Sequence, residues 1–134
     1  MTLARKLKLR PGARAAVLGA PGGYRRALGP LPEGTTLSSR LRGTYDWVQV
    51  FARSAADLRR LAPRALRALR TGSLLWVSFP KGTSSLQSDL TRDRGWEALR
   101  KYPLKWVVLV SVDDTWSAFC VRPFRPGESR RSFR

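Results

Sequence analysis

The sequence predicts an α/β fold: an open, mostly parallel β-sheet with helices on both faces and an antiparallel hairpin at one edge. Three observations predict it. Apolar runs of strand length, bounded by Gly, Pro or polar residues, alternate with helical segments. One of these segments keeps helical periodicity over residues 54–69. Two apolar runs near the C-terminus flank a short acidic turn, as in a hairpin. Strands that alternate with helices favour parallel pairing.

The individual elements follow from local patterns. Strands are expected at residues 13–18, 35–41, 45–51, 73–79, 104–112 and 115–121. Helices are expected at residues 24–28, 54–69 and 96–101. In the long helix, Ser54 and Asp57 predict an N-terminal capping box, and Pro63 predicts a kink or a second start.

Length and composition indicate one domain. The chain has 134 residues, of which 43% are hydrophobic and five are Trp, and this favours one packed core. We expect a basic arm at residues 1–10, the α/β domain at 11–122, and a basic, disordered tail at 123–134. The sequence has no apolar run long enough for a membrane span and no secretory signal, so we expect a cytoplasmic protein.

The sequence is poor in catalytic residue types. It has no His and one Cys, which excludes His-based dyads, internal disulfides and multi-cysteine zinc sites. Cys120 lies in an apparent strand, and we interpret it as a buried small hydrophobe. Asp113 and Asp114 form an acidic pair that a hairpin turn explains at least as well as a Mg²⁺ site. We therefore predict no catalytic residue and no metal site.

The charge of the chain is its strongest functional signal. Twenty-six Lys and Arg against nine Asp and Glu give a formal net charge of +17, spread over both ends and the middle. Arg60, Arg64 and Arg67 form one solvent-facing row on the long helix. Such a molecule attracts polyanions, so we predict DNA or RNA as its partner, with Arg130 and Arg131 of the tail taking part. Charge that serves only solubility is the alternative.

A polar loop after the strand at 73–79 is a second candidate surface. Backbone amides of residues 82–85 are expected to cradle an anion, with Lys81 as the counter-charge. The predicted anion contacts are Lys81, Ser84, Ser85 and Arg92. In the alternative interpretation, Asp89 only caps the next turn and Arg92 pairs with a neighbour. Trp96 and Trp116 border the loops, where they either stack on a base or pack in the core.

Several motifs resemble those of a known superfamily. VLGAPGG at residues 17–23 resembles the glycine-rich first motif of class I, Rossmann-like methyltransferases, which use S-adenosylmethionine. TYDWVQVF at 44–51 resembles their central strand, and LRTGSLLWVSFPKG at 69–82 resembles a later helix-to-strand stretch. The span 8–122 is similar to a family of short, uncharacterised bacterial methyltransferase-like proteins, through PKGTSSLQSDLTRDRGW and VSVDDTWSAF. The resemblance implies a Rossmann-like fold and a cofactor loop at Gly19, Gly22, Gly23 and Lys81.

The sequence also departs from the active pattern of that superfamily. Its enzymes end the second strand with an acid that holds the cofactor ribose, whereas this chain has Ser38, Ser39 and Arg40 there. Residues 23–45 are too few for the usual two strand-helix units, and Gln49 and Phe51 stand where a catalytic Asp region is expected. We therefore expect no cofactor, with S-adenosylmethionine as the alternative.

Three functional hypotheses remain from the sequence. The first is a non-enzymatic nucleic-acid-binding protein that grips phosphates through its arm, tail and helix row. The second is a reduced methyltransferase or nucleotide-binding enzyme that uses the loops at 19–23 and 81–85. The third is an interaction module that docks on an acidic protein partner.

Overall fold

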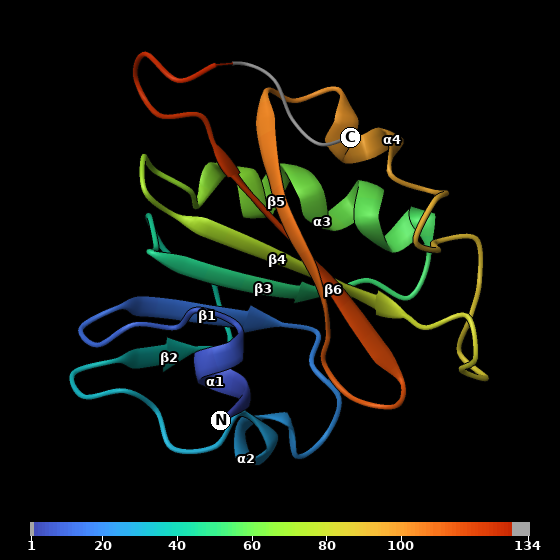
Figure 1. The fold of residues 1–134 in the computed structure, drawn as a ribbon, viewed down its shortest axis with the longest axis horizontal. Coiled ribbons are helices and arrows are strands. Elements are labelled where there is room, and N and C mark those ends of the chain that lie inside the picture. The colour runs from blue at the N-terminus through green and yellow to red at the C-terminus, as the bar shows by residue number, and fades with distance from the viewer. Residues whose placement is uncertain (1, 130–134) are drawn as a thin grey trace.

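The fold is built around one six-stranded sheet. The structure is a computed structural model that describes residues 2–129, in which the strand order is β2-β1-β3-β4-β6-β5 (Figure 1). The strands are β1 (Arg14–Leu18), β2 (Thr36–Ser38), β3 (Trp47–Phe51), β4 (Leu74–Pro80), β5 (Leu104–Ser111) and β6 (Trp116–Pro123). The first four strands are parallel, and β6 runs antiparallel to both β4 and β5. This arrangement confirms the predicted sheet and its edge hairpin.

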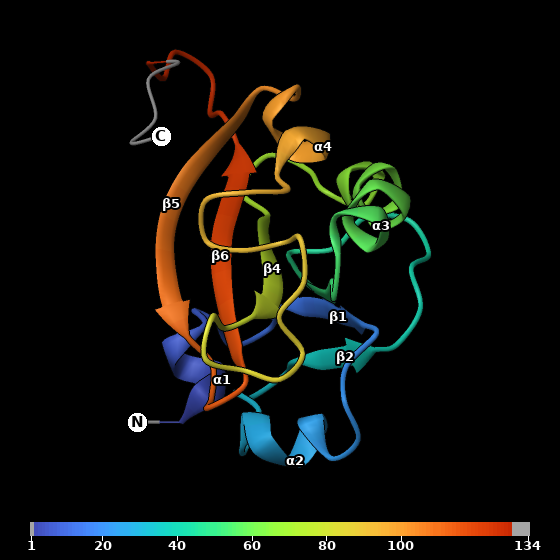
Figure 2. The same ribbon diagram turned by 90° about the vertical axis from the view of Figure 1, so that its right-hand side faces the viewer.

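Helices cover both faces of this sheet. They are α1 (Leu3–Lys6), α2 (Tyr24–Leu28), α3 (Ala55–Arg67) and α4 (Glu97–Arg100). Two apolar clusters show the two layers: one contains Leu58 of α3 and Leu99 of α4, and the other contains Ala4 of α1 and Leu28 of α2. Figure 2 shows α3 and α4 together, apart from α1 and α2. No helix in residues 2–129 combines the length and apolar character that a membrane crossing requires.

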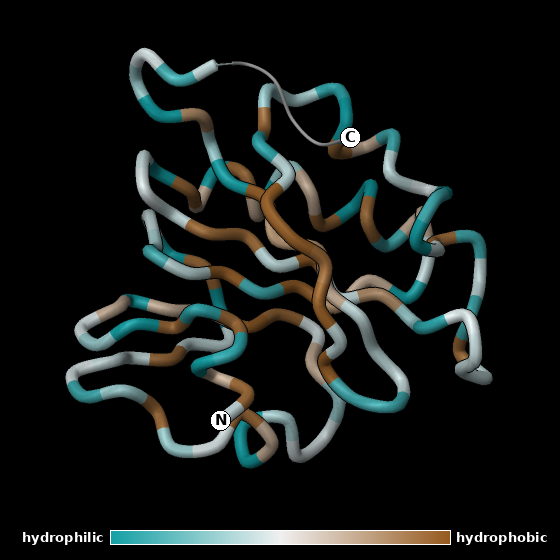
Figure 3. Tube along the Cα trace, viewed as in Figure 1, coloured by the Kyte–Doolittle hydropathy of each residue, from teal (hydrophilic) through white to brown (hydrophobic). Residues whose placement is uncertain are grey.

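The central strands are buried on both faces. All residues of β3 are buried, and β4 is buried from its second residue onward. Figure 3 shows the hydrophobic residues along these strands and the hydrophilic ones mostly in the loops. Trp47, Trp76 and Trp106 are core residues, as predicted. Trp96 and Trp116 are only 0% and 3% exposed, so base stacking by these rings is excluded and the packing interpretation is confirmed.

The long helix has the predicted cap but is not divided. Ser54 Oγ accepts a hydrogen bond from the Asp57 amide at 3.1 Å, and Asp57 Oδ2 accepts one from the Arg53 amide at 2.9 Å. Pro63 lies inside α3, which is one continuous element. The expectation of a second start is therefore wrong. Pro63 lacks the backbone donor that would reach the Arg59 carbonyl, and Arg59 is an exposed residue on the solvent side of the helix.

Both ends of the described chain are tied to the sheet. The expected basic arm contains α1, and its Ala4, Leu7 and Leu9 are buried. Trp47 Nε1 donates to the Leu7 carbonyl at 2.8 Å, which fastens this segment to β3. At the other end, β6 continues to Pro123 and a turn follows. Arg130 and Arg131 lie outside the described residues.

Two smaller features complete the fold. Cys120 is buried in β6, and burial raises the pKa of its thiol to about 12, which confirms it as a small core residue.

The edge strand β5 has an irregular register against β6 between Trp106 and Val108. The opposite edge strand, β2, has only three residues.

The carboxyl ends of the parallel strands share one edge, which positions the candidate site. β1 pairs with β2 on one side and with β3 on the other. The strand order therefore reverses at β1, and ligands of open α/β sheets bind outside the carboxyl ends of the strands at such a point.

Candidate functional site

The glycines of the loop after β1 differ in their surroundings: Gly19 lies against a neighbouring strand, whereas Gly22 and Gly23 face open space. Gly19 has φ +72°, and a Cβ there would lie 3.2 Å from the Phe51 carbonyl oxygen, so glycine lets β1 end close against β3. Gly23 is left-handed and forms the N-cap of α2. A Cβ at Gly22 or Gly23 would meet no atom within 4 Å. The open part of the loop is therefore available to a ligand, whereas Gly19 serves the fold.

A cavity of about 310 Å³ lies between this loop and the end of β2. Its lining residues are Val17, Ala20, Pro21, Gly23, Tyr24, Arg25, Leu37, Ser38 and Ser39. Ser38 Oγ accepts from the Arg40 amide at 3.0 Å and donates to the Arg40 carbonyl at 2.8 Å, which shapes the turn after β2. In the described part of the chain, no carboxylate lines this cavity.

A buried chain of polar side chains and a cluster of aromatic rings connect α2 with the strands β3, β4 and β6. The Tyr24 hydroxyl donates to Gln49 Oε1 at 2.7 Å, and Gln49 Nε2 donates to Ser78 Oγ at 2.8 Å. Burial raises the pKa of the Tyr24 hydroxyl well above its usual value. The Phe51 ring contacts the Tyr24 and Trp116 rings edge-on, at centroid distances of 4.8 and 5.0 Å. Gln49 and Phe51 therefore pack inside the protein, and neither lines the cavity beside β2.

The loop after β4 brings together only part of the predicted anion site. Lys81 Nζ donates to Ser111 Oγ at 2.7 Å, and the Ser84 amide donates to the Lys81 carbonyl at 2.9 Å. The Ser84 amide is thus occupied within a turn. Lys81 and Arg92 line the same cavity of about 520 Å³, but Ser84 and Ser85 do not line it.

This loop is attached to α3 by contacts that the sequence did not indicate. Asp89 Oδ1 accepts a hydrogen bond from the Ala55 amide at 2.8 Å. Asp89 therefore caps the start of α3, 34 residues earlier in the sequence, and not the turn that follows Asp89. The Ser88 hydroxyl donates to the Arg53 carbonyl. No local pattern signals such a distant cap, because helix-capping motifs span only a few residues.

The arginine row on α3 is present and exposed. Arg60, Arg64 and Arg67 are exposed, while the opposite face of α3 is buried. Arg60 lies 3.3 Å from Asp57 Oδ1, an exposed ion pair of the kind that contributes little to stability. The row therefore keeps most of its positive character. Its contact with nucleic acid stays a prediction.

The acidic pair serves the hairpin. Asp113 Oδ1 accepts hydrogen bonds from the Thr115 and Trp116 amides, each at 2.8 Å. In residues 2–129, no group of three or more Asp, Glu, Cys or His side chains is placed to hold a metal ion. The hydrogen bonds to the Thr115 and Trp116 amides therefore support the interpretation of Asp113 as a turn residue.

Comparisons with known proteins give the fold a context. No protein-family model matches the sequence, and no curated protein matches it. Solved structures do match. A TehB-like SAM-dependent methyltransferase from Corynebacterium glutamicum is 13% identical with a TM-score of 0.61, covering 92% of this chain and 89% of that one. The chain has a shortened class I methyltransferase-like fold.

Two further solved structures agree with this methyltransferase-like fold. The DhpI complex with SAH is 11% identical with a TM-score of 0.62, covering 91% of this chain and 82% of that one. The ribosomal protein L11 methylase from Lactobacillus delbrueckii subsp. bulgaricus is 12% identical with a TM-score of 0.59, covering 91% of this chain and 75% of that one.

These matches correct one expectation from the sequence. We expected no cofactor because the second strand lacks the usual acid. One of the solved structures that share the fold is described as a SAM-dependent methyltransferase, and another is a complex with SAH, the demethylated form of that cofactor. On this finding the expectation of no cofactor is wrong. The short stretch from Gly23 to Tyr45 does hold a single helix and a single strand, as its length predicted.

Proposed function

We propose that this protein binds DNA or RNA along the arginine row of α3, on its methyltransferase-like scaffold. The observation that carries the proposal is the exposed row Arg60, Arg64 and Arg67 in a chain of net charge +17. Asp57 is the one acid within α3. Exposed helix faces usually mix both signs of charge, and a row of one sign matches a phosphate backbone. The proposal includes a cytoplasmic location, where nucleic acid is found.

This mode of binding has a physical signature. Contacts to phosphates position a protein on nucleic acid but do not read its bases, so we expect weak sequence selectivity. Affinity should fall steeply with salt, because each phosphate contact releases counterions. An acidic protein partner, in contrast, would stay bound after nuclease treatment.

The test compares two triple variants that lose the same charge. Fluorescence anisotropy would follow a labelled single strand of about 20 nucleotides from about 50 to 200 mM salt. The variant R60Q/R64Q/R67Q should reduce the slope of log affinity against log salt by about 2, since each single-strand contact contributes about 0.7. The matched variant R26Q/R42Q/R100Q changes three other exposed arginines and should lower the slope less. Equal effects, or no binding at about 50 mM salt, would refute the proposal.

A second candidate function is S-adenosylmethionine binding, favoured by the cavity between the glycine loop and β2. The residues present fit this group. Arg25 offers a guanidinium for a ligand carboxylate, and the open backbone at Gly23 leaves room for close approach. Ser38 and Ser39 at the end of β2 also line the cavity, in the stretch where the resemblance leads us to expect the ribose-binding acid. When bound, the cofactor would supply an electrophilic methyl group.

The residues of this cavity bind and orient a ligand rather than move protons. In the described part of the chain, its polar side chains are serines, Arg25 and Tyr24. The raised pKa of Tyr24 keeps its hydroxyl protonated at neutral pH. The proton acceptor for any transfer reaction therefore has to come from the substrate or from elsewhere.

Calorimetry with S-adenosylmethionine and SAH tests this second function. The variant Ala20→Trp places a bulky ring at the cavity and should abolish binding. Ala27→Trp adds the same ring on the exposed side of α2, outside the lining residues, and should leave binding unchanged. Absence of heat with both ligands at about 1 mM would remove this candidate.

A further inference from the structure

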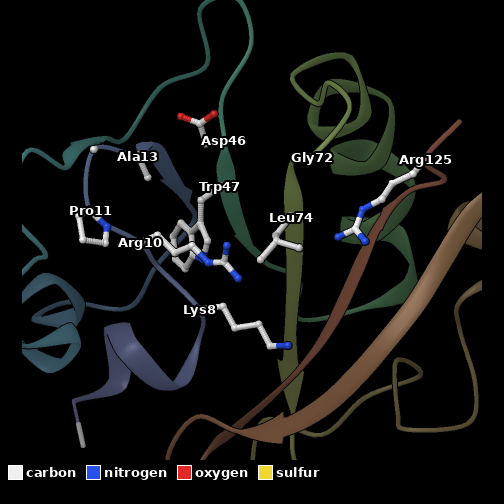
Figure 4. Close-up of a pocket in the computed structure, with 10 residues that line it drawn as sticks. Lys8, Arg10, Pro11, Ala13, Asp46, Trp47, Gly72, Leu74 and Arg125 are labelled. Carbon is white, nitrogen blue, oxygen red and sulfur yellow. The ribbon is translucent and has the colours of Figure 1, made fainter.

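A second concave region lies at the opposite edge of the sheet. A cavity of about 370 Å³ opens at the amino-terminal ends of β1, β3 and β4 (Figure 4). It is lined by Lys8, Arg10, Pro11, Gly12, Ala13, Asp46, Trp47, Gly72, Leu74 and Arg125. Parallel strands place their two ends at opposite edges, so this cavity is separate from the glycine loop and from the loop after β4. Neither proposed function uses it.

Three cations from the two ends of the chain meet at this cavity. Figure 4 shows the charged ends of Lys8, Arg10 and Arg125 turned toward the same space beside Leu74. Within residues 2–129, none of these three charged groups has a hydrogen bond or an ion pair. Like charges gathered around one cavity repel each other, and a bound anion removes that repulsion.

The one acid among the lining residues is already engaged. Asp46 accepts a hydrogen bond from the Arg14 amide at 2.8 Å and pairs with the Arg70 guanidinium. These contacts hold the pKa of Asp46 below its usual value. Its carboxylate points away from the three cations in Figure 4. The cavity thus keeps an excess of positive charge.

Lys8 adopts a backbone conformation that favours glycine. Its φ is +61°, and it is the one non-glycine residue with positive φ in the described part of the chain. The Lys8 amide donates to the Arg5 carbonyl and the Leu9 amide to the Ala4 carbonyl, each at 3.0 Å. This is a Schellman motif with Lys at its left-handed position, where glycine is usual. The conformation costs folding free energy, and in return Leu7 and Leu9 are buried while Lys8 lines the cavity.

Arg125 is held in place by a carboxylate that pairs elsewhere. The Arg125 amide donates to Glu128 Oε1 at 2.9 Å, and the Glu128 amide donates to the Arg125 carbonyl at 3.0 Å. The two Glu128 oxygens accept from the Arg122 guanidinium at 2.8 and 2.6 Å. Glu128 therefore fixes the turn without neutralising the Arg125 side chain.

We infer that this cavity is a binding site for a phosphate group. One guanidinium group donates two parallel hydrogen bonds to the oxygens of a phosphate, and a lysine ammonium adds a further positive charge. The volume lies at the low end for ligand cavities, which fits a phosphate or diphosphate rather than a large organic ligand. The phosphate has two sources, a free diphosphate compound or the backbone of a nucleic acid.

Binding of inorganic pyrophosphate and of a labelled oligonucleotide to the full chain tests the site. Arg125→Gln should weaken binding about tenfold, as expected for the loss of a charge-assisted hydrogen bond. Lys8→Gly relieves the left-handed strain and should raise Tm by about 3 °C while it also weakens binding. If Lys8 had only a structural role, the Lys8→Gly variant would gain thermal stability without losing affinity for the ligand. Arg26→Gln on α2 removes the same charge outside the cavity and should change neither.

The two ligands distinguish the sources of the phosphate. Weaker binding of pyrophosphate in both cavity variants supports a site for a free phosphate compound, and weaker binding of the oligonucleotide alone supports a backbone phosphate. The proposal is overturned if both variants bind both ligands like the wild type, or if Arg26→Gln loses as much affinity as they do. None of the α3 row residues lines this cavity, so the pyrophosphate measurement tests the site independently of the proposed function.

Discussion

At the residue scale, Gly95 shows how tightly the loop after β4 is folded. Its φ is +95°, and a Cβ there would lie 2.6 Å from the Asp89 carbonyl oxygen and 3.0 Å from Leu90 Cδ1. The neighbouring Trp96 and Leu90 are fully buried. Glycine is thus required for two reasons, its left-handed conformation and the close approach of the backbone.

Gly95→Ala should lower the free energy of unfolding by about 2 to 4 kcal/mol. About 1 kcal/mol comes from the left-handed conformation and the rest from overpacking. Gly72→Ala is the matched control, because Gly72 has φ +93° with no atom within 4 Å of an added Cβ. It should cost only about 1 kcal/mol. Urea denaturation would measure both, and equal losses would contradict the packing explanation.

The titration of the Glu128 carboxyl should show whether the C-terminal turn is formed in solution. The Arg122 guanidinium and the Arg125 amide lower the pKa of this carboxyl from 4.5 to about 2. Because the folded pKa is depressed, the contact is fully present above pH 4.5 and is lost as the pH falls toward 2.

The NMR shift of the Arg125 amide against pH would follow this loss. Its midpoint should lie near pH 2, and Arg122→Gln should move it up toward 4.5. A midpoint near 4.5 in the wild type would show that the pair is absent in solution.

At the element scale, α3 depends on a segment far away in the sequence. Amides of its first turn donate to Ser54, the residue just before the helix, and to Asp89 from the loop. The loop and the helix therefore order each other, since the Ala55 amide would otherwise lack a partner.

Asp89→Ala should destabilise the protein by about 1 kcal/mol, as the loss of a helix cap does. Hydrogen exchange should become faster at Ala55 and across residues 81–95. Asp93→Ala, an exposed acid of the same loop, should leave both readouts unchanged. Similar effects of the two variants would argue for a charge effect instead of a cap.

The predictable elements are those with strong local patterns. The apolar runs at 45–51 and 73–79 and the periodicity of 54–69 predicted β3, β4 and α3 within a few residues. Helix α1 has only four residues, too few to show a period, and its place depends on the bond from Trp47 to the Leu7 carbonyl.

Much of the candidate site depends on tertiary contacts. The glycine loop was visible in the sequence, but Lys8 and Arg125 come together only through the fold. Likewise, no local pattern places the Lys81 ammonium on Ser111, because the two residues lie 30 positions apart.

At the scale of the whole molecule, positive charge dominates. The net charge is +17, and several acids of the described residues already pair with arginines: Asp46, Asp57 and Glu128. The remaining cations repel one another over the surface, and this repulsion favours the expanded, unfolded chain.

Added sodium chloride should therefore raise Tm. The Debye length falls from about 30 Å at 0.01 M to about 8 Å at 0.15 M, so screening removes much of the repulsion. The variant R60Q/R64Q/R67Q carries less charge and should show a smaller rise. Differential scanning calorimetry would measure both proteins, and a Tm that is flat or falls with salt would contradict the argument.

The irregular register of β5 has a consequence for how copies of this chain meet. An open sheet exposes unpaired backbone groups at its rims, which invite a strand from another molecule. At one rim the pairing of the outermost strand shifts register between Trp106 and Val108, and at the other rim the strand is only three residues long. Neither rim offers a long regular edge, and we expect this to disfavour edge-to-edge pairing between copies of the chain despite its long apolar strands.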